Sequence, residues 1–512
     1  MRTSMSWLKT LPQDIPAGIV VFLVAVPLCL GISLASGAPP LSGLIAGIIG
    51  GLVVALVSGS HVSVSGPAAG LTVIVLGAIQ AIGFEGMLLA TALAGAMQLA
   101  FGYLRMGKIG AFVPSAVIKG MLTAIGLILI LNQIPLALGL PQENAPGFTQ
   151  PIAMLQHASP LAFSIALIAL LILILWDTAF ISRIKWLKMI PAPLLAVIAG
   201  VGIDRIALQG SFLSPLNADQ RITLPGLEGP ADFFSQLHLP DFSMLFNPQV
   251  YMVALTIALV ASLETLLSLE AADKIDPFKR HSPPHRELKA QGVGNLCSGL
   301  VGGLPITAVI VRSSANVQAG ARTRFSSFVH GILLLASVTF FAAALELIPF
   351  ACLAAILLHT GYKLARPALF IAHYRQGWNR FLPYVITIMA IMLTDLLKGV
   401  IVGLLCSLYF LVRSNFRSAI SFTKHGRHCL LRIHKDVSFL NREEMRGYLD
   451  AVPDDSFVII DATEANFIDP DIQEDINNFI QASKQSNVTV ELKSVDGLSA
   501  TFPGLSPSPR FA

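Results

Sequence analysis

The sequence predicts a polytopic α-helical membrane protein with a small α/β domain at its carboxy-terminal end. Of its 512 residues, 54% are hydrophobic and only 12% are charged, whereas a typical soluble domain has about 25% charged residues. Long apolar runs recur from Ile15 to Val412, and a helix that spans a bilayer needs about 20 such residues. After Val412 the composition becomes polar and charged, which indicates a second domain in water.

Fourteen segments are predicted to cross the membrane. Twelve are apolar runs, and the other two, 288–301 and 306–317, are too short or too polar to face lipid alone. In chain order the predicted spans are 15–35, 41–57, 71–82, 87–104, 116–131, 161–176, 191–206, 250–269, 288–301, 306–317, 328–345, 349–362, 381–397 and 399–412.

The charges of the loops indicate which way these spans cross the membrane. Loop 131–160 follows an odd-numbered span and has no lysine or arginine. Because basic loops stay in the cytoplasm, we expect both termini and the polar domain there, and a multi-pass protein of the inner (plasma) membrane. The first apolar run continues directly into further spans, so a cleavable signal is not expected. Basic residues gather instead in the loops after even-numbered spans, at 105–108, 183–188, 274–289, 322–324 and 363–380.

The sequence shows no signature of catalysis. Its five cysteines form no C-x-x-C pair, and no spacing of histidine and acidic residues indicates a catalytic metal. No nucleophile stands beside a candidate base. We therefore expect a protein that is not an enzyme, has no cofactor and binds no nucleic acid.

The two halves of the membrane domain are related by a nearly constant spacing. Pro67 and Pro305 are 238 residues apart, and Pro114 and Pro349 are 235 apart. Seven spans in each half force the second copy to enter the membrane upside down, which is an inverted repeat. Chance spacing is the alternative, because proline and glycine are common in membrane helices.

Two stretches, 62–72 and 302–310, predict helices that begin inside the membrane. Each places proline and small residues between an extended run and an apolar run. A helix starting there has free backbone N–H groups, which attract anions. A matched pair of broken spans is typical of a transporter's binding site. Close helix packing uses the same small residues and is the alternative.

Three ionisable residues within the apolar runs need an explanation. Glu264 lies inside the eighth span, where a charge costs at least about 2.5 to 3.5 kcal/mol and usually serves function. Ser268 lies one turn further on the same helix face. Arg312 and Lys119 are candidates for charge balance, with Lys119 the alternative partner of a purely structural Glu264. Both cations could instead extend to the cytoplasmic edge of the membrane.

Several motifs together resemble the SulP (sulfate permease) family. They are Val64–Gly70, Ser262–Ser268, Gln291–Asn295 and Val311–Val317, in this order. The resemblance implies a uracil-permease-like fold of seven plus seven spans, with a core of spans 1–4 and 8–11 that moves against a gate of spans 5–7 and 12–14. The runs 14–31 and 117–122 are similar to the branch associated with carbonic anhydrases, which implies bicarbonate.

The resemblance also implies a mechanism and its residues. We expect secondary active bicarbonate uptake by sodium symport with an elevator-like movement. The first alternative is a sulfate transporter or chloride/sulfate exchanger, with a proton as the coupling ion. The second is an anion channel on the same fold. Expected partners are membrane lipid, a second copy in a homodimer, and a carbonic anhydrase. The anion-binding candidates are Ser65, Gly66, Ala68, Ala69, Thr72, Thr307, Ala308, Val309 and Ile310, and the sodium or proton candidates are Glu264, Ser268, Ala308 and Ile310.

The carboxy-terminal region resembles a STAS domain. We expect the membrane domain to span 1–414, a basic linker 415–427, the short STAS domain 428–497 and a disordered tail 498–512. Asp469-Pro470-Asp471 replaces the family's frequent Asp-Ser phosphorylation site, which argues against phosphoregulation at this point. The predicted strands are 429–434, 457–461 and 488–492, and the predicted helices are 442–450 and 471–484.

Overall fold

The chain forms two compact units, Met1–Gly403 and Leu404–Ala512. The structure is a computed structural model, and it describes residues 7–107, 114–140, 154, 156–178, 190–209, 215–217, 220–224, 235–416, 419–465, 467–483 and 486–494. The predicted disordered tail, 498–512, lies outside the described residues.

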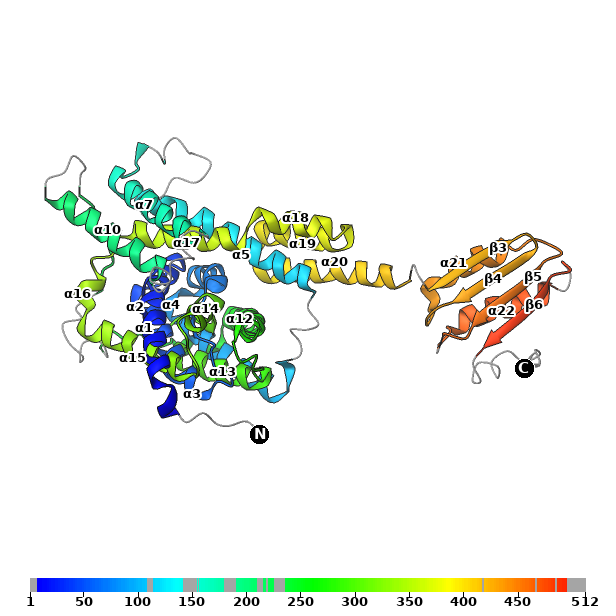
Figure 1. Cartoon of the computed structure of the whole chain (residues 1–512), viewed down its shortest axis with the longest axis horizontal. Helices are drawn as coiled ribbons and strands as arrows, with labels where there is room; N and C mark the ends of the chain where they lie inside the picture. The colour runs from blue at the N-terminus through cyan, green and yellow to red at the C-terminus, as the bar shows by residue number, and fades with distance from the viewer. Residues whose placement is uncertain are drawn as a thin grey trace. The chain divides into compact units, whose positions relative to one another are not determined.

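Helices α1 to α20 pack in two groups, which we call core and gate below (Figure 1). In the core group, α4 packs on α12 and α13, while α1 packs on α2 and α15. In the gate group, α5 packs on α17 and α19, while α7 packs on α10 and α17. The core helices are α1 (Trp7–Ala35), α2 (Pro40–Ile49), α3 (Ala55–Val57), α4 (Thr72–Tyr103), α12 (Pro248–Ile275), α13 (Pro284–Leu300), α14 (Ile310–Gln318) and α15 (Phe325–Phe340); the gate helices are α5 (Ser115–Ala137), α7 (Pro160–Trp176), α10 (Ala192–Leu208), α17 (Phe350–Leu364), α19 (Trp378–Leu393) and α20 (Leu396–Phe416).

Every predicted span has a counterpart among these helices, with local differences. The spans 71–82 and 87–104 both lie in α4, which bends at Gly83, where φ is 73°. Glycine adopts this left-handed conformation without strain. The structure adds two short helices, α16 (Ala342–Leu345) and α18 (Pro367–Arg375). By length and composition, five described helical segments can cross a membrane: Thr10–Ala35, Pro40–Val57, Ala69–Tyr103, Ser115–Ala137 and Pro248–Ile275.

Helix α13 is polar because it is enclosed by protein. Its Glu287, Gln291 and Asn295 are all fully buried. The contact with α4 is made backbone to backbone: a Cβ added to Gly292 would lie 2.7 Å from the backbone nitrogen of Leu99. Such close approach is how small residues hold membrane helices together, and it explains a span that is too polar for lipid.

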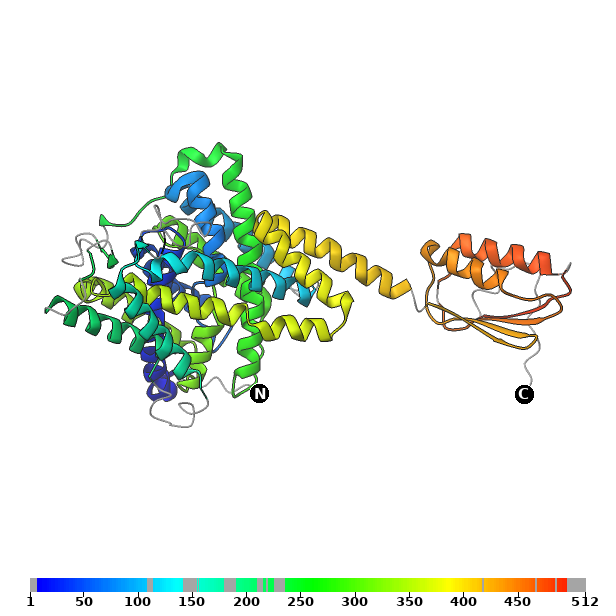
Figure 2. The same cartoon turned by 90° about the horizontal axis from the view of Figure 1, so that it is seen from above.

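In the second unit, two helices cover one face of a four-stranded sheet (Figure 2). The strand order is β3-β4-β5-β6, with β3 antiparallel to β4 and the other neighbours parallel. The predicted helices and strands are present within about two residues. The elements are β3 (Ile420–His425), β4 (His428–Ile433), α21 (Arg442–Asp450), β5 (Phe457–Ala462), α22 (Pro470–Ser483) and β6 (Thr489–Ser494).

Strand β3 corrects the predicted linker, 415–427. Its residues pair with β4 from Ile420 opposite Ile433 to His425 opposite His428. Ile420 is buried in the sheet core, whereas Lys424 and His425 are exposed. These exposed basic residues gave the stretch the composition of a linker, and only two alternating apolar positions, Ile420 and Phe422, signal the strand.

Candidate functional site at two broken helices

The structure brings the two broken helices together through a short β-ladder. Strand β1 (Ser65–Pro67) pairs antiparallel with β2 (Ile306–Ala308), so that Ser65 lies opposite Ala308. The Val309 N–H adds a bond of 2.9 Å to the carbonyl oxygen of Val64. All six strand residues are buried. Antiparallel pairing of equivalent segments fits an inverted repeat, and it satisfies backbone groups that lipid could not.

Both helices that follow the ladder begin without a side-chain cap. A 3₁₀ turn at Ala69–Leu71 leads into α4 at Thr72, and its N-cap residue Ala68 is extended. Helix α14 begins at Ile310 after extended Val309. A helix start without a cap leaves backbone N–H groups for an anion, together with about half a positive charge. The predicted residues Ala68, Val309 and Ile310 therefore lie at the two starts.

Helix α12 contacts both helix starts. The backbone N–H of Gly70 donates a hydrogen bond to the Glu264 carboxyl group. The hydroxyl of Thr265 accepts one from the Ala308 N–H at 3.3 Å. The other oxygen of Glu264, Oε2, is buried and has no hydrogen-bond partner within the described ranges. Sequence reasoning missed Thr265, although it directly follows Glu264 in a motif that had been singled out.

Arg312 is fully buried beside the first helix start. Its Nη2 donates to the Pro67 carbonyl oxygen and to Cys29 Sγ, both at 3.4 Å. Its Nε and Nη1 have no partner in the part of the chain that the structure describes. No ion pair joins Arg312 to Glu264 there, so the structure does not pair the two charges directly.

Ser65 is held by a buried chain of polar side chains. Gln291 Nε2 donates to Ser65 Oγ at 2.7 Å and to Glu287 Oε1 at 3.1 Å. Ser58 Oγ donates to Glu287 Oε2 at 2.6 Å. Gln291 Nε2 is the donor in both of its bonds, so the NH₂ end of the amide faces Glu287 and Ser65. Ser65 Oγ is then an acceptor for Gln291, and its own hydrogen is left for another acceptor.

The hydroxyl groups of the other two candidates donate hydrogen bonds to nearby backbone carbonyls. Thr72 Oγ1 donates to the carbonyl oxygen of Ala69 at 2.7 Å, and Thr307 Oγ1 donates to that of Ala308 at 3.2 Å. Both residues are buried. Each oxygen can still accept but no longer donates. Ser65 is therefore the candidate hydroxyl whose hydrogen is best placed to serve an anion.

Asn295 anchors β2 in a way that the sequence did not reveal. Its side-chain amide donates to the Ile306 carbonyl oxygen at 2.9 Å and accepts from the Ile306 N–H. It also donates to Gln98 Oε1 at 2.7 Å, and Gln98 donates to Ser262 Oγ at 3.2 Å. A single amide thus replaces a strand neighbour and joins β2 to α4 and α12.

Lys119 requires a correction. The structure places it exposed on the second turn of α5, and it does not bring Lys119 together with Glu264 or Arg312. A lysine near a helix end can extend its ammonium group away from apolar surroundings, which was the alternative. Ser268, in contrast, is buried on α12 one turn beyond Glu264.

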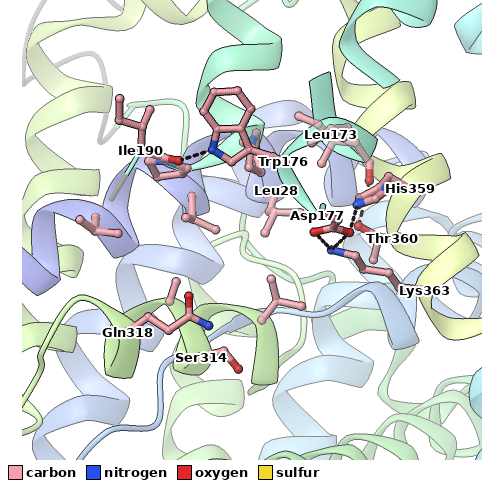
Figure 3. A pocket seen from close by; sticks show the side chains of 18 of the residues that line it. Leu28, Leu173, Trp176, Asp177, Ile190, Ser314, Gln318, His359, Thr360 and Lys363 are labelled. Carbon is pink, nitrogen blue, oxygen red and sulfur yellow. Dashed lines mark hydrogen bonds and ion pairs between the residues drawn. The ribbon is translucent and has the colours of Figure 1, made fainter. Parts of the chain in front are cut away.

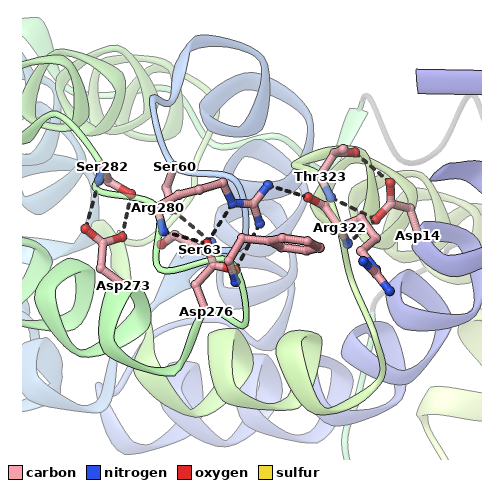
Figure 4. Close-up of polar contacts among 10 residues, drawn as sticks. Asp14, Ser60, Ser63, Asp273, Asp276, Arg280, Ser282, Arg322 and Thr323 are labelled. Carbon is pink, nitrogen blue, oxygen red and sulfur yellow. Dashed lines mark hydrogen bonds and ion pairs between the residues drawn. The ribbon is translucent and has the colours of Figure 1, made fainter. Parts of the chain in front are cut away.

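A polar network ties the ends of the core helices together (Figure 4). Buried Asp14 of α1 accepts hydrogen bonds from the Arg322 N–H at 2.7 Å and from the Thr323 hydroxyl at 2.6 Å. Arg280 donates to the Arg322 carbonyl oxygen at 2.8 Å and to Asp276 Oδ2 at 2.7 Å. This network joins α1 to the loops that follow α12 and α14, so these parts of the core are fixed to one another.

A cavity of about 580 Å³ lies between core helices α1 and α14 and gate helices α7, α10 and α17 (Figure 3). Val311 and Ser314 of α14 line it on the core side. Val311 stands between Ile310 and Arg312 in the sequence and is 47% exposed. The cavity therefore adjoins the start of the second broken helix, at the boundary between core and gate.

Comparison with known proteins gives consistent results. The family model described as "Sulfate permease family" matches residues 11–390. The chain is 31% identical over 417 residues to "Putative sulfate transporter YvdB" of Bacillus subtilis, covering 79% of this chain and 74% of the relative. It is 29% identical over 370 residues to "Bicarbonate transporter BicA" of Picosynechococcus sp., covering 70% of this chain and 62% of the relative.

Two kinds of solved structure share the fold. The transmembrane domain of a cyanobacterium bicarbonate transporter BicA superposes with a TM-score of 0.63 at 26% identity, covering 78% of this chain and 98% of that chain. The overall structure of SLC26A9 gives a TM-score of 0.76 at 16% identity, covering 95% of this chain and 86% of that chain. The second match extends the likeness in fold to the carboxy-terminal unit.

Proposed function

The chain belongs to the sulfate permease family, a family of membrane anion transporters, and we propose that it takes up bicarbonate together with sodium. In this proposal the anion binds at the two broken helix starts, and the core carries it past the gate in an elevator-like movement. The core network around Asp14 and the separate packing of the gate helices support movement of the core as one body.

One observation carries the proposal: two buried groups of opposite charge lie at the same helix start with unmatched polar atoms. A Cβ built on Gly66 would lie 2.1 Å from Arg312 Nη1, and one built on Gly70 would lie 2.6 Å from Glu264 Oε2. Arg312 has two unpartnered donor nitrogens, Nε and Nη1, for an anion, and Glu264 has an oxygen for a cation. Because leaving buried charged groups unmatched is costly, the pair supports binding of an anion and a cation together.

The predicted cation ligands suit sodium. Glu264 supplies a carboxylate oxygen, Ser268 supplies a hydroxyl on the same helix, and the carbonyls of Ala308 and Ile310 are in and beside the broken segment. Transporters with broken helices bind sodium through such carbonyls and neighbouring side chains. Among the described residues no cluster of three histidine, cysteine or acidic side chains competes for a transition metal.

Bicarbonate is the first choice of anion because of the polar groups at hand. Its oxygens can accept from Arg312, from the Ser65 hydroxyl and from backbone N–H groups, and its own O–H can donate to a nearby carbonyl or carboxylate oxygen. A relative named as a bicarbonate transporter supports this choice. Sulfate is the second candidate, because another relative bears that name and its oxygens suit the same donors; Glu264 would then carry a proton.

Uptake into proteoliposomes separates these proposals. We expect labelled bicarbonate to accumulate when a sodium gradient is imposed, and unlabelled bicarbonate inside to accelerate its uptake. Sodium-independent accumulation of sulfate would favour the second candidate. Flux without counterflow would indicate a channel, which needs no alternating access.

The variant Glu264→Gln tests the coupling site. The amide keeps the shape but loses the charge, and a hydrogen bond or ligand to a charged group is worth about 1.5 to 3 kcal/mol, so sodium should bind roughly ten- to 150-fold more weakly. Glu270→Gln is the matched control, because Glu270 lies on the same helix but is exposed and paired with Lys274. Unchanged sodium dependence in Glu264→Gln would exclude this assignment.

A further inference from the structure

The gate wall of the cavity carries a group of charged side chains outside the broken-helix site (Figure 3). Lys363 Nζ lies 3.0 and 2.8 Å from the two carboxylate oxygens of Asp177, and His359 Nε2 lies 2.9 Å from Asp177 Oδ2. His359 and Lys363 are one turn apart on α17, while Asp177 ends α7. Lys363 and His359 therefore both contact the same carboxylate.

Asp177, His359 and Lys363 line the cavity and differ in how exposed their side chains are. The side chains of Asp177 and Lys363 are 45% and 38% exposed, whereas that of His359 is 10% exposed. The cavity is lined by α1 and α14, by the ends of α7 and α17 and by the start of α10. The basic loops assign all of these ends to the cytoplasmic side. An anion passing between the broken-helix site and that side can reach the group.

We propose that Lys363 and His359 form a second anion-binding station, and that Asp177 is a tethered competitor for it. The Asp177 carboxylate occupies the position of an anion: both of its oxygens contact Lys363, and one also contacts His359. The opposite wall offers an amide at Gln318 and a hydroxyl at Ser314. When a free anion arrives, it exchanges with Asp177, which can turn toward solvent because it is half exposed.

The ligand class follows from the geometry of the competitor. A carboxylate is planar with two oxygens on one carbon, and bicarbonate presents the same arrangement. Sulfate is tetrahedral and more strongly hydrated, so it matches less well. We therefore assign the station to small planar carboxylate-like anions. The station shares no residue with the broken-helix site, so anion binding there can be tested separately from the proposed transport function.

Trp176, which also lines the cavity, gives a direct readout. The chain has four tryptophans, and replacing Trp7, Trp186 and Trp378 with phenylalanine leaves Trp176 as the only fluorophore of this kind. Iodide serves as an anionic quencher and acrylamide as a neutral one, with the purified full-length chain in detergent. An exposed ion pair is worth about 0.2 to 1 kcal/mol, so Asp177→Asn should raise the iodide quenching constant roughly 1.4- to fivefold.

Three comparisons decide the outcome. Acrylamide quenching should stay constant in Asp177→Asn, and adding Lys363→Gln should remove the gain in iodide quenching. Bicarbonate should protect Trp176 from iodide more than sulfate does at equal ionic strength. Asp395→Asn is the matched control, because its partner Lys398 is likewise exposed. Unchanged iodide quenching, a parallel rise with acrylamide, or equal protection by sulfate would overturn the assignment.

Discussion

Replacing Gly66 with alanine tests whether Arg312 binds the anion. The added Cβ would lie 2.1 Å from Arg312 Nη1, whereas unbonded heavy atoms need about 3.5 Å. The guanidinium group must therefore move by roughly 1.4 Å. Because Arg312 is fully buried, it cannot extend into solvent and must move within a packed interior. A donor displaced that far loses its hydrogen bond, since these bonds tolerate only about 0.5 Å.

The expected effect follows from that loss. A hydrogen bond to a charged group contributes about 1.5 to 3 kcal/mol, which is roughly a ten- to 150-fold loss of anion affinity. The assay is the concentration dependence of bicarbonate uptake in proteoliposomes. Gly77→Ala is the control, because Gly77 lies on α4 and a Cβ there meets no atom within 4 Å.

Folding must be separated from binding in this experiment. Overpacking alone can cost about 1 to 3 kcal/mol of stability, so thermal unfolding of both alanine variants should be measured. Arg312→Lys provides a second route, since it keeps the charge, adds no methyl group and removes the forked donors. If Gly66→Ala and Arg312→Lys both fold and both keep the original anion affinity, Arg312 does not contact the anion.

Two other predictions concern different parts of the molecule. Gln291→Glu should weaken anion affinity by roughly tenfold, because a carboxylate there would accept the Ser65 hydrogen. The measurement is an uptake assay, with Gln133→Glu as a control at another buried glutamine. Normal anion affinity in Gln291→Glu would contradict the proposed orientation of the Ser65 hydroxyl. In the second unit, hydrogen bonds from Arg442 and then Arg446 hold the pKa of Asp475 well below its usual range. Such a group stabilises the fold above its unfolded pKa of about 3.9 and loses this contribution as the pH falls toward the folded value. Asp475→Asn should therefore lower the hydrogen-exchange protection of α21 and α22 at pH 7. Below pH 4, the protection of the variant should fall less steeply than that of the original chain. An unchanged acid profile would show that Asp475 contributes nothing.

Much of the fold could be predicted because lipid imposes strong constraints on sequence. The apolar runs and the spacing of Pro67 and Pro305 gave the spans and the repeat, and the structure confirms this fold class. The ladder of β1 and β2 could not be read in the same way, because three-residue strands are too short to show a period of two. Broken backbone at membrane depth must be satisfied by protein, but this requirement does not predict that the two broken segments pair with each other.

The candidate site was predictable in its residue types but not in its partners. Glu264 and Arg312 stood out as charges in apolar runs, whereas Thr265, Gln291 and Asn295 lay inside the quoted motifs without an assigned role, because uncharged polar residues are common in enclosed helices. Their partners lie elsewhere in the sequence: Gln291 contacts Ser65, 226 positions away, and Thr265 contacts Ala308, 43 positions away. Lys119 shows the opposite case: the sequence placed it within an apolar run, but the structure places it exposed near the start of α5.

The proposed coupling of anion and cation can be understood from the segment that they share. Gly66 is the residue against which Arg312 lies, and Gly70, four residues later, donates to Glu264. A shift of the segment between them, Pro67–Ala69, changes both contacts at once. Helix α12 also holds the second broken helix through Thr265 and Ala308. Binding free energies coupled in this way are reciprocal. On this proposal, sodium raises the affinity for bicarbonate by the same factor by which bicarbonate raises the affinity for sodium. Binding assays in which each ion is varied in turn must therefore give the same factor.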